Sequence, residues 1–241
     1  WIICIPFKRT FLFHPTRLSA HNFQLTQDLC RSYNATGITE DIYIPQNIQL
    51  MQALRPDLQE IAVIGDCQFF GIYSTLLVKK YLQEYPSDLK FTFLDGRFLS
   101  TNTLYESLQH LSPNTGILLT GWMQDAEGYL YDHEKVHHNI CQLAPTPVFS
   151  VTDWGNNNID YIGGYYAESF DYGVLLSELA LRVLGGVPAK AIPLQSNTQS
   201  LGVHINETLL EANHLNIGNC NTSRLYFYNR PPTFWTKHRT L

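Results

Sequence analysis

Two sets of side chains have the types and spacing to do chemistry, and the sharper set is a histidine pair. His133, Glu134 and His137 form a His-Glu-x-x-His pattern, in which two histidines one helical turn apart bind zinc and the glutamate acts as general base. A metalloprotease needs a third protein ligand, and neither a Gly-x-x-His extension nor a suitable glutamate follows. Val136 and Ile140 share the face of the histidines, so we expect this face to pack against a sheet. A zinc hydrolase is kept only as a remote alternative.

No other catalytic pattern stands out in the sequence. It contains no Gly-x-Ser-x-Gly elbow, no phosphate-binding Walker loop and no Gly-x-Gly-x-x-Gly after an apolar run. The 5 cysteines form no Cys-x-x-Cys pair, which argues against a zinc ribbon, and Cys67 is interpreted as a small buried residue. We therefore expect a protein that is not an enzyme and that uses no metal and no cofactor.

The second set of side chains follows apolar runs, and the clearest run is Ile61 to Gly65. This unbroken run, rich in β-branched residues, is typical of a strand buried on both faces. Asp66 and Gln68 come directly after it, and Gly71 opens a stretch with helical spacing. In an open α/β sheet the carboxyl ends of the strands line the ligand crevice, so these polar residues lie where a small molecule would bind.

The same unit repeats along the chain. Strands are predicted over Lys90–Leu94, Gly116–Thr120 and Thr146–Val151, and they alternate with helices over Thr103–Leu111 and Asp132–Leu143, the latter capped by Asp132. Strands that alternate with helices in this way indicate a parallel sheet with right-handed crossovers. Each strand ends in a polar turn at the same edge.

The remaining segments are predicted to include two further helices, a flexible connection and an extended segment. A helix is expected over Pro45–Leu54, and the best helix of the chain over Phe170–Leu184, where two glycines end it. Gly163 to Tyr166 is predicted to be a flexible connection. An extended segment is expected over Ser200–Ile205, and the segment from Arg230 onward is too rich in proline for regular structure.

Composition limits the classes of protein to which the chain can belong. The 241 residues are 44% hydrophobic, enough for a packed core, and only 15% charged. The net charge of -5 and the absence of a basic stripe argue against a nucleic-acid partner. No apolar run reaches the roughly 20 residues that a membrane helix needs, and the first residues do not have the order of a signal peptide.

Several segments, taken in order from Asn34 onward, carry a resemblance to a known family. They are Asn34–Glu40, Leu54–Asp57, Ile61–Asp66, Gly116–Thr120, Asp125–Gly128, Pro147–Phe149, Gly163–Gly164, Leu179–Gly186 and Asn229–Trp235. Their order and spacing, and not one specific motif, resemble the ABC-transporter substrate-binding-like family of type I periplasmic-binding folds. The closing segment resembles versions that serve as extracytoplasmic sensor domains of bacterial histidine kinases and related receptors.

The resemblance implies an α/β protein with two lobes, each a doubly wound parallel sheet. Residues 1–45 and 159–195 would form part of the first lobe and the crossovers. Residues 46–158 and 196–229 would form the second lobe, and residues 230–241 a juxtamembrane segment. Too few residues precede Asn34 for a whole first lobe, so the first lobe is expected to be incomplete.

The candidate ligand-binding residues follow from their positions after strand ends, and one lies on a crossover between lobes. Carboxylates there would hold an ammonium group, and aromatic rings would stack on an apolar or cationic solute. The alternative is structural: the aspartates after strands would cap helices or hold turns, and the tryptophans would belong to the core. The candidates are Asp66, Gln68, Thr120, Trp122, Asp125, Asp153, Trp154 and Tyr165.

The function that the resemblance implies is an extracytoplasmic sensing domain of a membrane receptor, of the two-component kinase type, which signals when its lobes close on a small organic solute. An amino-acid-like compound is one candidate for this solute. The alternative is the solute-binding component of an ABC transporter. The expected location is periplasmic or extracellular, with a membrane tether outside this sequence. A homodimer stays open, because no apolar face defines an interface.

Overall fold

The structure is a computed structural model that describes residues 2–3, 12–13, 28, 31–154, 160–220, 222 and 224–231 of the chain. The chain divides into two compact units. Unit 1 comprises residues 1–42, 153–155 and 167–201, and unit 2 comprises residues 43–152, 156–166 and 202–241. Each unit has its own strands and its own buried apolar residues.

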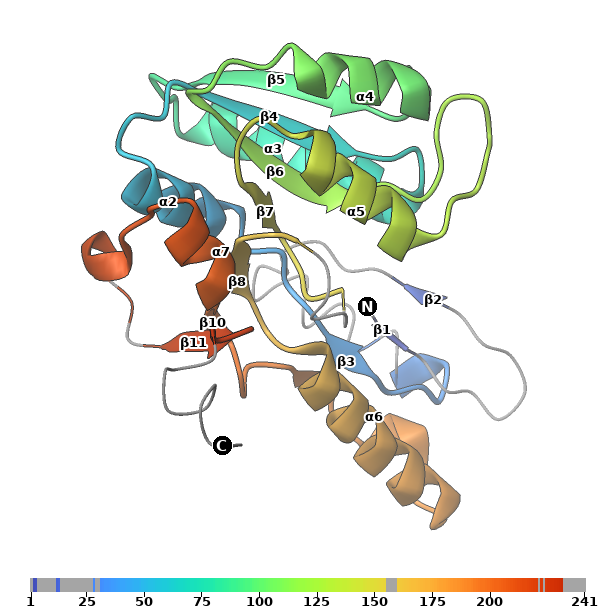
Figure 1. Cartoon of the computed structure of the whole chain (residues 1–241). Helices are drawn as coiled ribbons and strands as arrows, with labels where there is room; N and C mark the ends of the chain where they lie inside the picture. Colours follow the sequence, from blue (N-terminus) through green and yellow to red (C-terminus); the bar gives the residue numbers. More distant parts are fainter. Residues whose placement is uncertain are drawn as a thin grey trace, which may run out of the picture. The chain divides into compact units, whose positions relative to one another are not determined.

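Unit 2 is built on a 7-stranded sheet with the order β11-β10-β8-β7-β6-β4-β5 (Figure 1). The five adjacent strands β5, β4, β6, β7 and β8 are parallel to one another. Strand β10 is antiparallel to β8, and β11 is parallel to β10. The strands are β4 (Glu60–Gly65), β5 (Lys90–Asp95), β6 (Thr115–Gly121), β7 (Val148–Ser150), β8 (Gly163–Tyr166), β10 (Gly202–Asn206) and β11 (Leu225–Tyr228).

The central strands are apolar because both of their faces are covered. Every residue of β6 is buried, and so is every residue of β4 except Glu60. Continuous apolar runs of this kind are what a parallel sheet covered by helices on both faces requires. The strands predicted over Ile61–Gly65, Lys90–Leu94, Gly116–Thr120 and Thr146–Val151 are confirmed.

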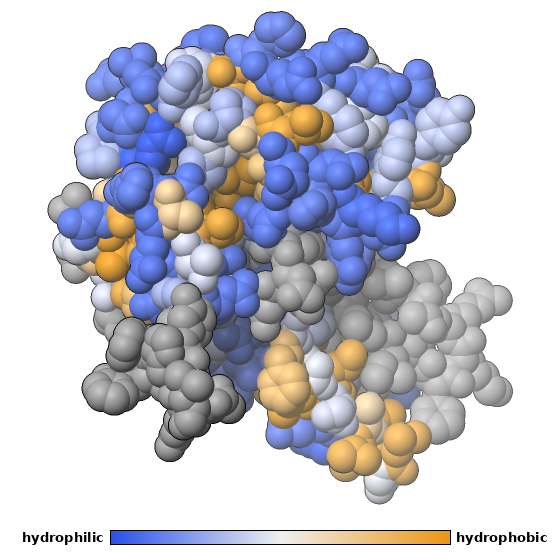
Figure 2. All heavy atoms as spheres, viewed as in Figure 1, coloured by the Kyte–Doolittle hydropathy of each residue, from blue (hydrophilic) through white to orange (hydrophobic). Residues whose placement is uncertain are grey.

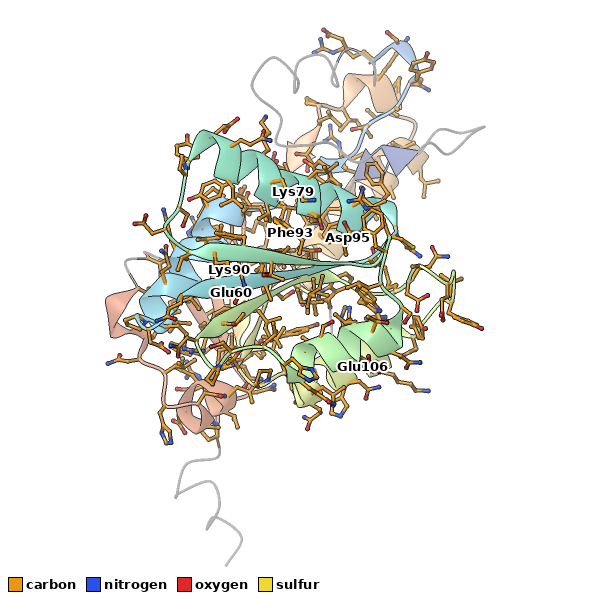
Figure 3. The ribbon with its side chains drawn as sticks, turned by 90° about the horizontal axis from the view of Figure 1, so that it is seen from above. Glu60, Lys79, Lys90, Phe93, Asp95 and Glu106 are labelled. Carbon is orange, nitrogen blue, oxygen red and sulfur yellow. The ribbon has the colours of Figure 1, made fainter. Side chains whose placement is uncertain are left out.

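Helices cover both faces of the sheet of unit 2. Helix α3 lies on one face, and α4 and α5 lie on the other (Figure 3). Helix α2 packs against α3, and α4 packs against α5. The helices are α2 (Ile44–Leu54), α3 (Phe69–Glu84), α4 (Thr101–Gln109), α5 (His133–Leu143) and α7 (Glu207–Ala212). Helix α5 begins after Asp132, whose side chain accepts a hydrogen bond from the Lys135 N–H, so the predicted cap is confirmed.

One prediction about this sheet was wrong, and two of its features were not predicted. Gly163 to Tyr166 is not a flexible connection but strand β8, which lies between β7 and β10. The sheet is mixed and not wholly parallel, because β10 runs against β8. The sequence analysis also overlooked β11, a short edge strand near the carboxyl terminus.

Unit 1 has much less regular structure in its described residues. Strand β3 (Ile38–Thr39) pairs in parallel with β9 (Gln195–Ser196), and β1 (Ile2–Ile3) pairs with β2 (Leu12–Phe13). Its longest element is α6 (Ser169–Leu184), which confirms the helix predicted over Phe170–Leu184. A short 3₁₀ helix, η1 (Ala189–Ala191), follows α6, and a second one in unit 2, η2 (Ile217–Asn219), follows α7.

Charged residues lie at both ends of β4 and β5. At the amino end of β4 and β5 the Lys90 ammonium forms an ion pair with the Glu60 carboxylate at 2.9 Å, and Asp95 lies at the opposite end (Figure 3). The Lys79 ammonium on α3 lies 4.7 Å from the ring centroid of Phe93, on the α3 side of the sheet.

None of the helices in the described part of the chain is long and apolar enough to cross a membrane.

Candidate binding edge of unit 2

The strand order of unit 2 places a ligand crevice beside its central strands. The chain passes from β4 to β5 on one side and then returns past β4 to β6 on the other side. A reversal of this kind is a topological switch point, and open α/β sheets bind ligands outside the carboxyl ends of the strands that flank it. We call the loops that follow β4, β5 and β6 the carboxyl edge of unit 2.

Asp66 ties two of these loops together. Its carboxylate is buried and accepts hydrogen bonds from the backbone N–H of Met123 at 2.9 Å and of Gln68 at 3.1 Å. Burial raises the pKa of the Asp66 carboxyl, although these backbone N–H groups favour its ionised form. Asp66 therefore joins the loop after β4 to the loop after β6. These contacts agree with the structural alternative given in the sequence analysis, in which the aspartate holds a turn.

Gly71 makes this arrangement possible. A Cβ atom at this position would lie 2.2 Å from Asp66 Oδ1 and 2.5 Å from the Asp66 backbone nitrogen. Only glycine lets the first turn of α3 approach the carboxylate so closely. The glycine at position 71 is thus required by the close packing of α3 on the loop after β4.

Asp125 is the centre of a second buried network. Its Oδ2 accepts hydrogen bonds from the Thr101 N–H and hydroxyl, both at 2.9 Å, and from the Tyr131 hydroxyl at 2.8 Å. Burial opposes ionisation of this carboxyl, but the hydrogen bonds from Thr101 and Tyr131 outweigh it and lower the pKa of Asp125. The network fixes the loop between β6 and α5 to the start of α4.

Trp122 belongs to the same buried network and is fully buried. Its indole Nε1 donates a hydrogen bond to the Thr101 hydroxyl at 2.9 Å. Its backbone N–H donates to Nε2 of His137 at 3.1 Å. The side chain is therefore part of the core of unit 2, as the alternative interpretation of Trp122 supposed.

The histidine pattern does not form a zinc site with the residues that the structure describes. His137 is buried, and its Nε2 accepts the Trp122 N–H, so that nitrogen is engaged by the backbone. Burial lowers the pKa of His137 to about 3, and the neighbouring His133 adds to this effect. Among the described residues, no group of three or more His, Cys, Asp or Glu side chains is placed to hold a metal ion.

Thr120 and Gln68 also lie at the carboxyl edge. The pairing of β4 with β6 shifts register between Ile64 and Gly65, and Thr120 occupies this irregularity. Its buried hydroxyl donates a hydrogen bond to the Ile64 carbonyl at 2.8 Å. Gln68 is the N-cap residue of α3, and its partly exposed side chain makes no cap hydrogen bond. Of the polar candidates at this edge, Gln68 is therefore the one with a side chain available to a solute.

The remaining candidates lie elsewhere in the fold. Asp153 and Trp154 are in unit 1, where Asp153 Oδ2 accepts a hydrogen bond from the backbone N–H of Ser169, the first residue of α6, at 2.7 Å. Tyr165 is in β8 of unit 2, and its backbone N–H donates to the Asn47 side chain at 2.8 Å. The structure thus brings together Asp66, Gln68, Thr120, Trp122 and Asp125, and contact of any of these residues with a ligand stays a prediction.

The sequence analysis missed exposed apolar side chains at the same edge. Phe69, the first residue of α3, is 62% exposed, and Phe98, which follows β5, is 76% exposed. Tyr129 and Leu130, in the loop after β6, are also largely exposed. The strand-end rule that selected the polar residues would have found these side chains as well, because they lie in the same loops.

Arg97 gives the loop after β5 a fixed geometry. Its guanidinium donates bidentate hydrogen bonds to the Asp95 carboxylate, the shortest at 2.6 Å. Burial raises the pKa of Asp95, but Arg97 outweighs this effect and lowers it overall. The guanidinium carbon also lies 5.3 Å from the ring centroid of Phe98. The carboxylates of Asp66, Asp95 and Asp125 therefore all have partners within the unit, and the exposed side chains at this edge are mainly apolar.

Comparison with known proteins places the fold. No protein-family model and no curated protein matches the sequence. The structure is similar to a conserved domain protein from Vibrio cholerae, with a TM-score of 0.55 and 16% identity over 75% of this chain. It is also similar to an ABC domain in complex with L-Trp from Streptococcus pneumonia, with a TM-score of 0.56 and 15% identity over 79% of this chain.

A third solved structure belongs to a substrate-binding protein with adhesive properties from Clostridium difficile. The TM-score is 0.57, with 12% identity over 81% of this chain. The matched parts cover 58%, 62% and 63% of the three neighbours, so the chain spans less than two thirds of their length. The chain therefore has the α/β fold of periplasmic substrate-binding-like proteins.

Proposed function

We propose that the chain binds a small organic solute at the carboxyl edge of unit 2. The observation that carries this proposal is the exposure of Phe69, the first residue of α3, and of Phe98, in the loop after β5, because both follow adjacent strands beside a topological switch point. Large aromatic side chains are costly to leave in water, and aromatic surface with a few placed polar groups is characteristic of ligand sites. The similarity of the fold to substrate-binding proteins supports the same function.

In this proposal the buried carboxylates have a structural role, whereas the sequence analysis suggested that they bind an ammonium group of the solute. Asp66 and Asp125 accept hydrogen bonds from neighbouring loops, so they hold the edge in shape and do not pair with an ammonium group of the solute. A site whose loops are already fixed binds with less loss of conformational entropy. The solute is therefore expected to meet apolar rings and the Gln68 amide, which favours a compound with a flat apolar part.

The finer function remains open between two proposals. One is the solute-binding component of an ABC transporter, supported by neighbours described as an ABC domain in complex with L-Trp and as a substrate-binding protein. The other is the sensor domain of a membrane receptor, supported by the resemblance of the closing segment Asn229–Trp235. Most of that segment lies outside the described residues, so the first proposal has at least as much support.

The gene itself separates the two proposals. A membrane helix and a signalling domain encoded after Leu241 would support the receptor. A stop codon, with permease and ATPase genes beside it, would support the transporter component. Both proposals place the protein outside the cytoplasm, and an alkaline-phosphatase fusion in the native host would test that location.

The test of solute binding is a thermal melt against amino acids, other small organic acids, purines and sugars. A ligand at about 100 times its dissociation constant adds about 2.7 kcal/mol. For a chain of this size each kcal/mol raises the melting temperature by about 2 to 4 degrees. We expect a shift of several degrees with a compound that has an aromatic or apolar part. The absence of any shift across the library, in the protein encoded by the whole gene, would contradict the proposal.

A further inference from the structure

The loop between β6 and α5 is folded on itself. We call residues 124–131 of this loop the arm. Gln124 pairs with Leu130 in an antiparallel bridge, and the backbone N–H of Tyr131 donates a hydrogen bond to the Met123 carbonyl at 2.8 Å. These contacts bring the start and the end of the arm together, so the arm has a shape of its own and is not an irregular connection.

The turn of the arm is fixed by Asp125 and Gly128. The Gly128 N–H donates a hydrogen bond to the Asp125 carbonyl at 3.0 Å, and the Glu127 N–H donates to Asp125 Oδ1 at 3.1 Å. Gly128 has a φ of 81°, in the left-handed region that favours glycine. The side-chain amide of Gln124 donates to the Gly128 carbonyl at 3.3 Å. Backbone and side chains together therefore hold the turn in one conformation.

The root of the arm is bonded to the two neighbouring loops of the carboxyl edge. The Gln124 carbonyl accepts a hydrogen bond from the Cys67 N–H at 3.2 Å, in the loop after β4. The Ala126 N–H donates to the Leu99 carbonyl at 3.1 Å, in the loop after β5. Because β4 lies between β6 and β5 in the sheet, the arm reaches from β6 across the carboxyl end of β4 to the loop after β5.

The arm carries two tyrosines with opposite surroundings. The Tyr131 hydroxyl donates a hydrogen bond to Asp125 Oδ2 at 2.8 Å. Tyr129 is 62% exposed, and its hydroxyl is bonded to none of the residues that the structure describes. Figure 1 shows the arm projecting beyond the amino ends of α4 and α5, and Figure 2 shows hydrophobic surface at the same place, next to hydrophilic residues. The unit thus fixes the position of Tyr129 without using its side chain.

We propose that Tyr129 is a specificity-determining residue of the solute site, and that Tyr131 and Asp125 are positioning residues that hold it in place. This inference rests on the proposed solute site. A tyrosine offers a ring face and a hydroxyl that donates and accepts hydrogen bonds, whereas the exposed rings of Phe69 and Phe98 offer apolar surface only. Tyr129 therefore selects a solute that has a hydrogen-bonding group beside its flat apolar part.

The contacts of the arm favour a fixed wall over a moving lid. A lid closes by rotation about flexible ends. At the start of the arm the Met123 N–H is bonded to the buried Asp66 carboxylate at 2.9 Å, and at its end the Tyr131 hydroxyl is bonded to Asp125. A wall that is already in place binds a solute with less loss of conformational entropy.

The first test is isothermal titration with the compound that gives the largest melting shift in the library of amino acids, organic acids, purines and sugars. We expect Tyr129→Ala to weaken binding about tenfold and Tyr129→Phe, which loses only the hydroxyl, about threefold or more. Tyr85→Ala, a tyrosine of similar exposure at the far end of α3, should leave the affinity unchanged.

The outcomes separate this inference from the proposed function. Unchanged affinity in Tyr129→Ala, together with weaker binding in Phe69→Ala, would overturn the role of Tyr129 and leave the solute site standing. A library without any binding compound would contradict the proposed function and this inference with it.

The positioning role has its own test in a double-mutant cycle. Tyr131→Phe removes the hydroxyl that is bonded to Asp125 and leaves the tip of the arm intact. We expect it to weaken binding about threefold in the wild type and to have no effect in the Tyr129→Ala background, because Tyr131 acts through Tyr129. Equal losses in the two backgrounds would overturn the positioning role.

The fixed position of the arm can be tested without any solute. Nuclear magnetic resonance relaxation of the backbone amides in the protein encoded by the whole gene should give order parameters of about 0.85 in the arm, as in β6. Values below about 0.6 in the arm alone would show a mobile loop and would overturn the inference.

Discussion

Two helices of equal length show how differently the two units of the chain are stabilised. Helices α3 and α6 both have 16 residues, yet α3 buries six of them and α6 only two, Leu175 and Leu179. Helix α3 lies on a sheet of seven strands, whereas α6 packs on a few residues around β3 and η1. Helical pattern alone therefore does not predict burial, because the partner layer decides how much apolar surface leaves water.

The largest expected difference between the units concerns a deletion of buried volume. Trp122→Ala removes a fully buried indole and its hydrogen bond to Thr101, and should lower the free energy of unfolding by about 3 to 5 kcal/mol. Leu181→Ala in the 241-residue chain removes an exposed side chain of α6 and should change it by no more than about 0.5 kcal/mol. Urea unfolding of both variants measures the two values, and similar losses would contradict the comparison.

The next effect concerns the buried carboxylate of Asp125. Asp125→Asn keeps the shape but removes the charge that accepts hydrogen bonds from Thr101 and Tyr131, and should cost about 1.5 to 3 kcal/mol near neutral pH. Because the pKa of Asp125 is lowered in the folded protein, its ionised form stabilises the fold above the unfolded value, about 3.9, and this contribution is lost as the pH falls through the folded pKa.

The difference between the wild type and Asp125→Asn should therefore be largest at neutral pH and shrink below about pH 4. Urea unfolding at a series of pH values measures it. A difference that grows toward low pH would mean that the carboxyl is bound as the protonated form, which would refute the network described for Asp125.

Two glycines in the two helices should respond in opposite directions to the same substitution. Gly71→Ala in α3 would place a methyl group 2.2 Å from Asp66 Oδ1 and should cost about 1 to 3 kcal/mol. Gly173→Ala in α6 meets no atom within 4 Å and should stabilise the helix by about 0.5 to 1 kcal/mol. Thermal unfolding of the two variants gives both signs, and a stabilised Gly71→Ala protein would show that α3 does not approach Asp66 closely.

A separate effect, which grows with falling pH, is expected in the pH dependence that His137 gives to unit 2. The folded pKa of about 3 lies below the ordinary value of 6.5, so the unfolded chain takes up a proton first as the pH falls. Stability should then decrease by about 1.4 kcal/mol per pH unit from about pH 6.5 downward because of this residue alone.

His137→Gln removes the titration and retains an acceptor for the Trp122 N–H, so its stability should fall less steeply between about pH 6.5 and pH 4. Parallel pH profiles of the variant and the wild type would contradict a buried neutral histidine. Adding zinc should leave both profiles unchanged.

The central part of unit 2 could be predicted from the sequence because its signals are local. The β-branched run of β4 and the cap at Asp132 each specify a structure within a few residues. Strand β8 could not be predicted in this way, since Gly163 and Gly164 have no side chains to show a pattern. They form a strand because β7 and β10 approach so closely that a Cβ on either residue would lie 1.9 Å from a carbonyl oxygen.

The candidate site could be located from the sequence but not resolved into roles. The strand-end rule selected the loops that follow β4 and β6, and the pairing of these strands places both loops at the same edge of the sheet, where ligand binding stays a prediction. It could not show that Asp66 and Asp125 are engaged, because their partners Met123 and Thr101 lie far along the chain or in another loop. It also missed the exposed ring of Phe98, because the exposure of a side chain depends on the neighbours that the fold supplies.

The most direct test of the account is isothermal titration of the best solute from the melting screen with three proteins: the wild type, Phe69→Ala and Tyr85→Ala. Phe69 lies at the carboxyl edge and Tyr85 at the other end of the same helix, and their exposures, 62% and 57%, are similar. We predict that Phe69→Ala weakens binding about tenfold or more, equivalent to about 1.4 kcal/mol, and that Tyr85→Ala leaves the affinity unchanged. Equal affinities in all three proteins would contradict a binding site at the carboxyl edge of unit 2.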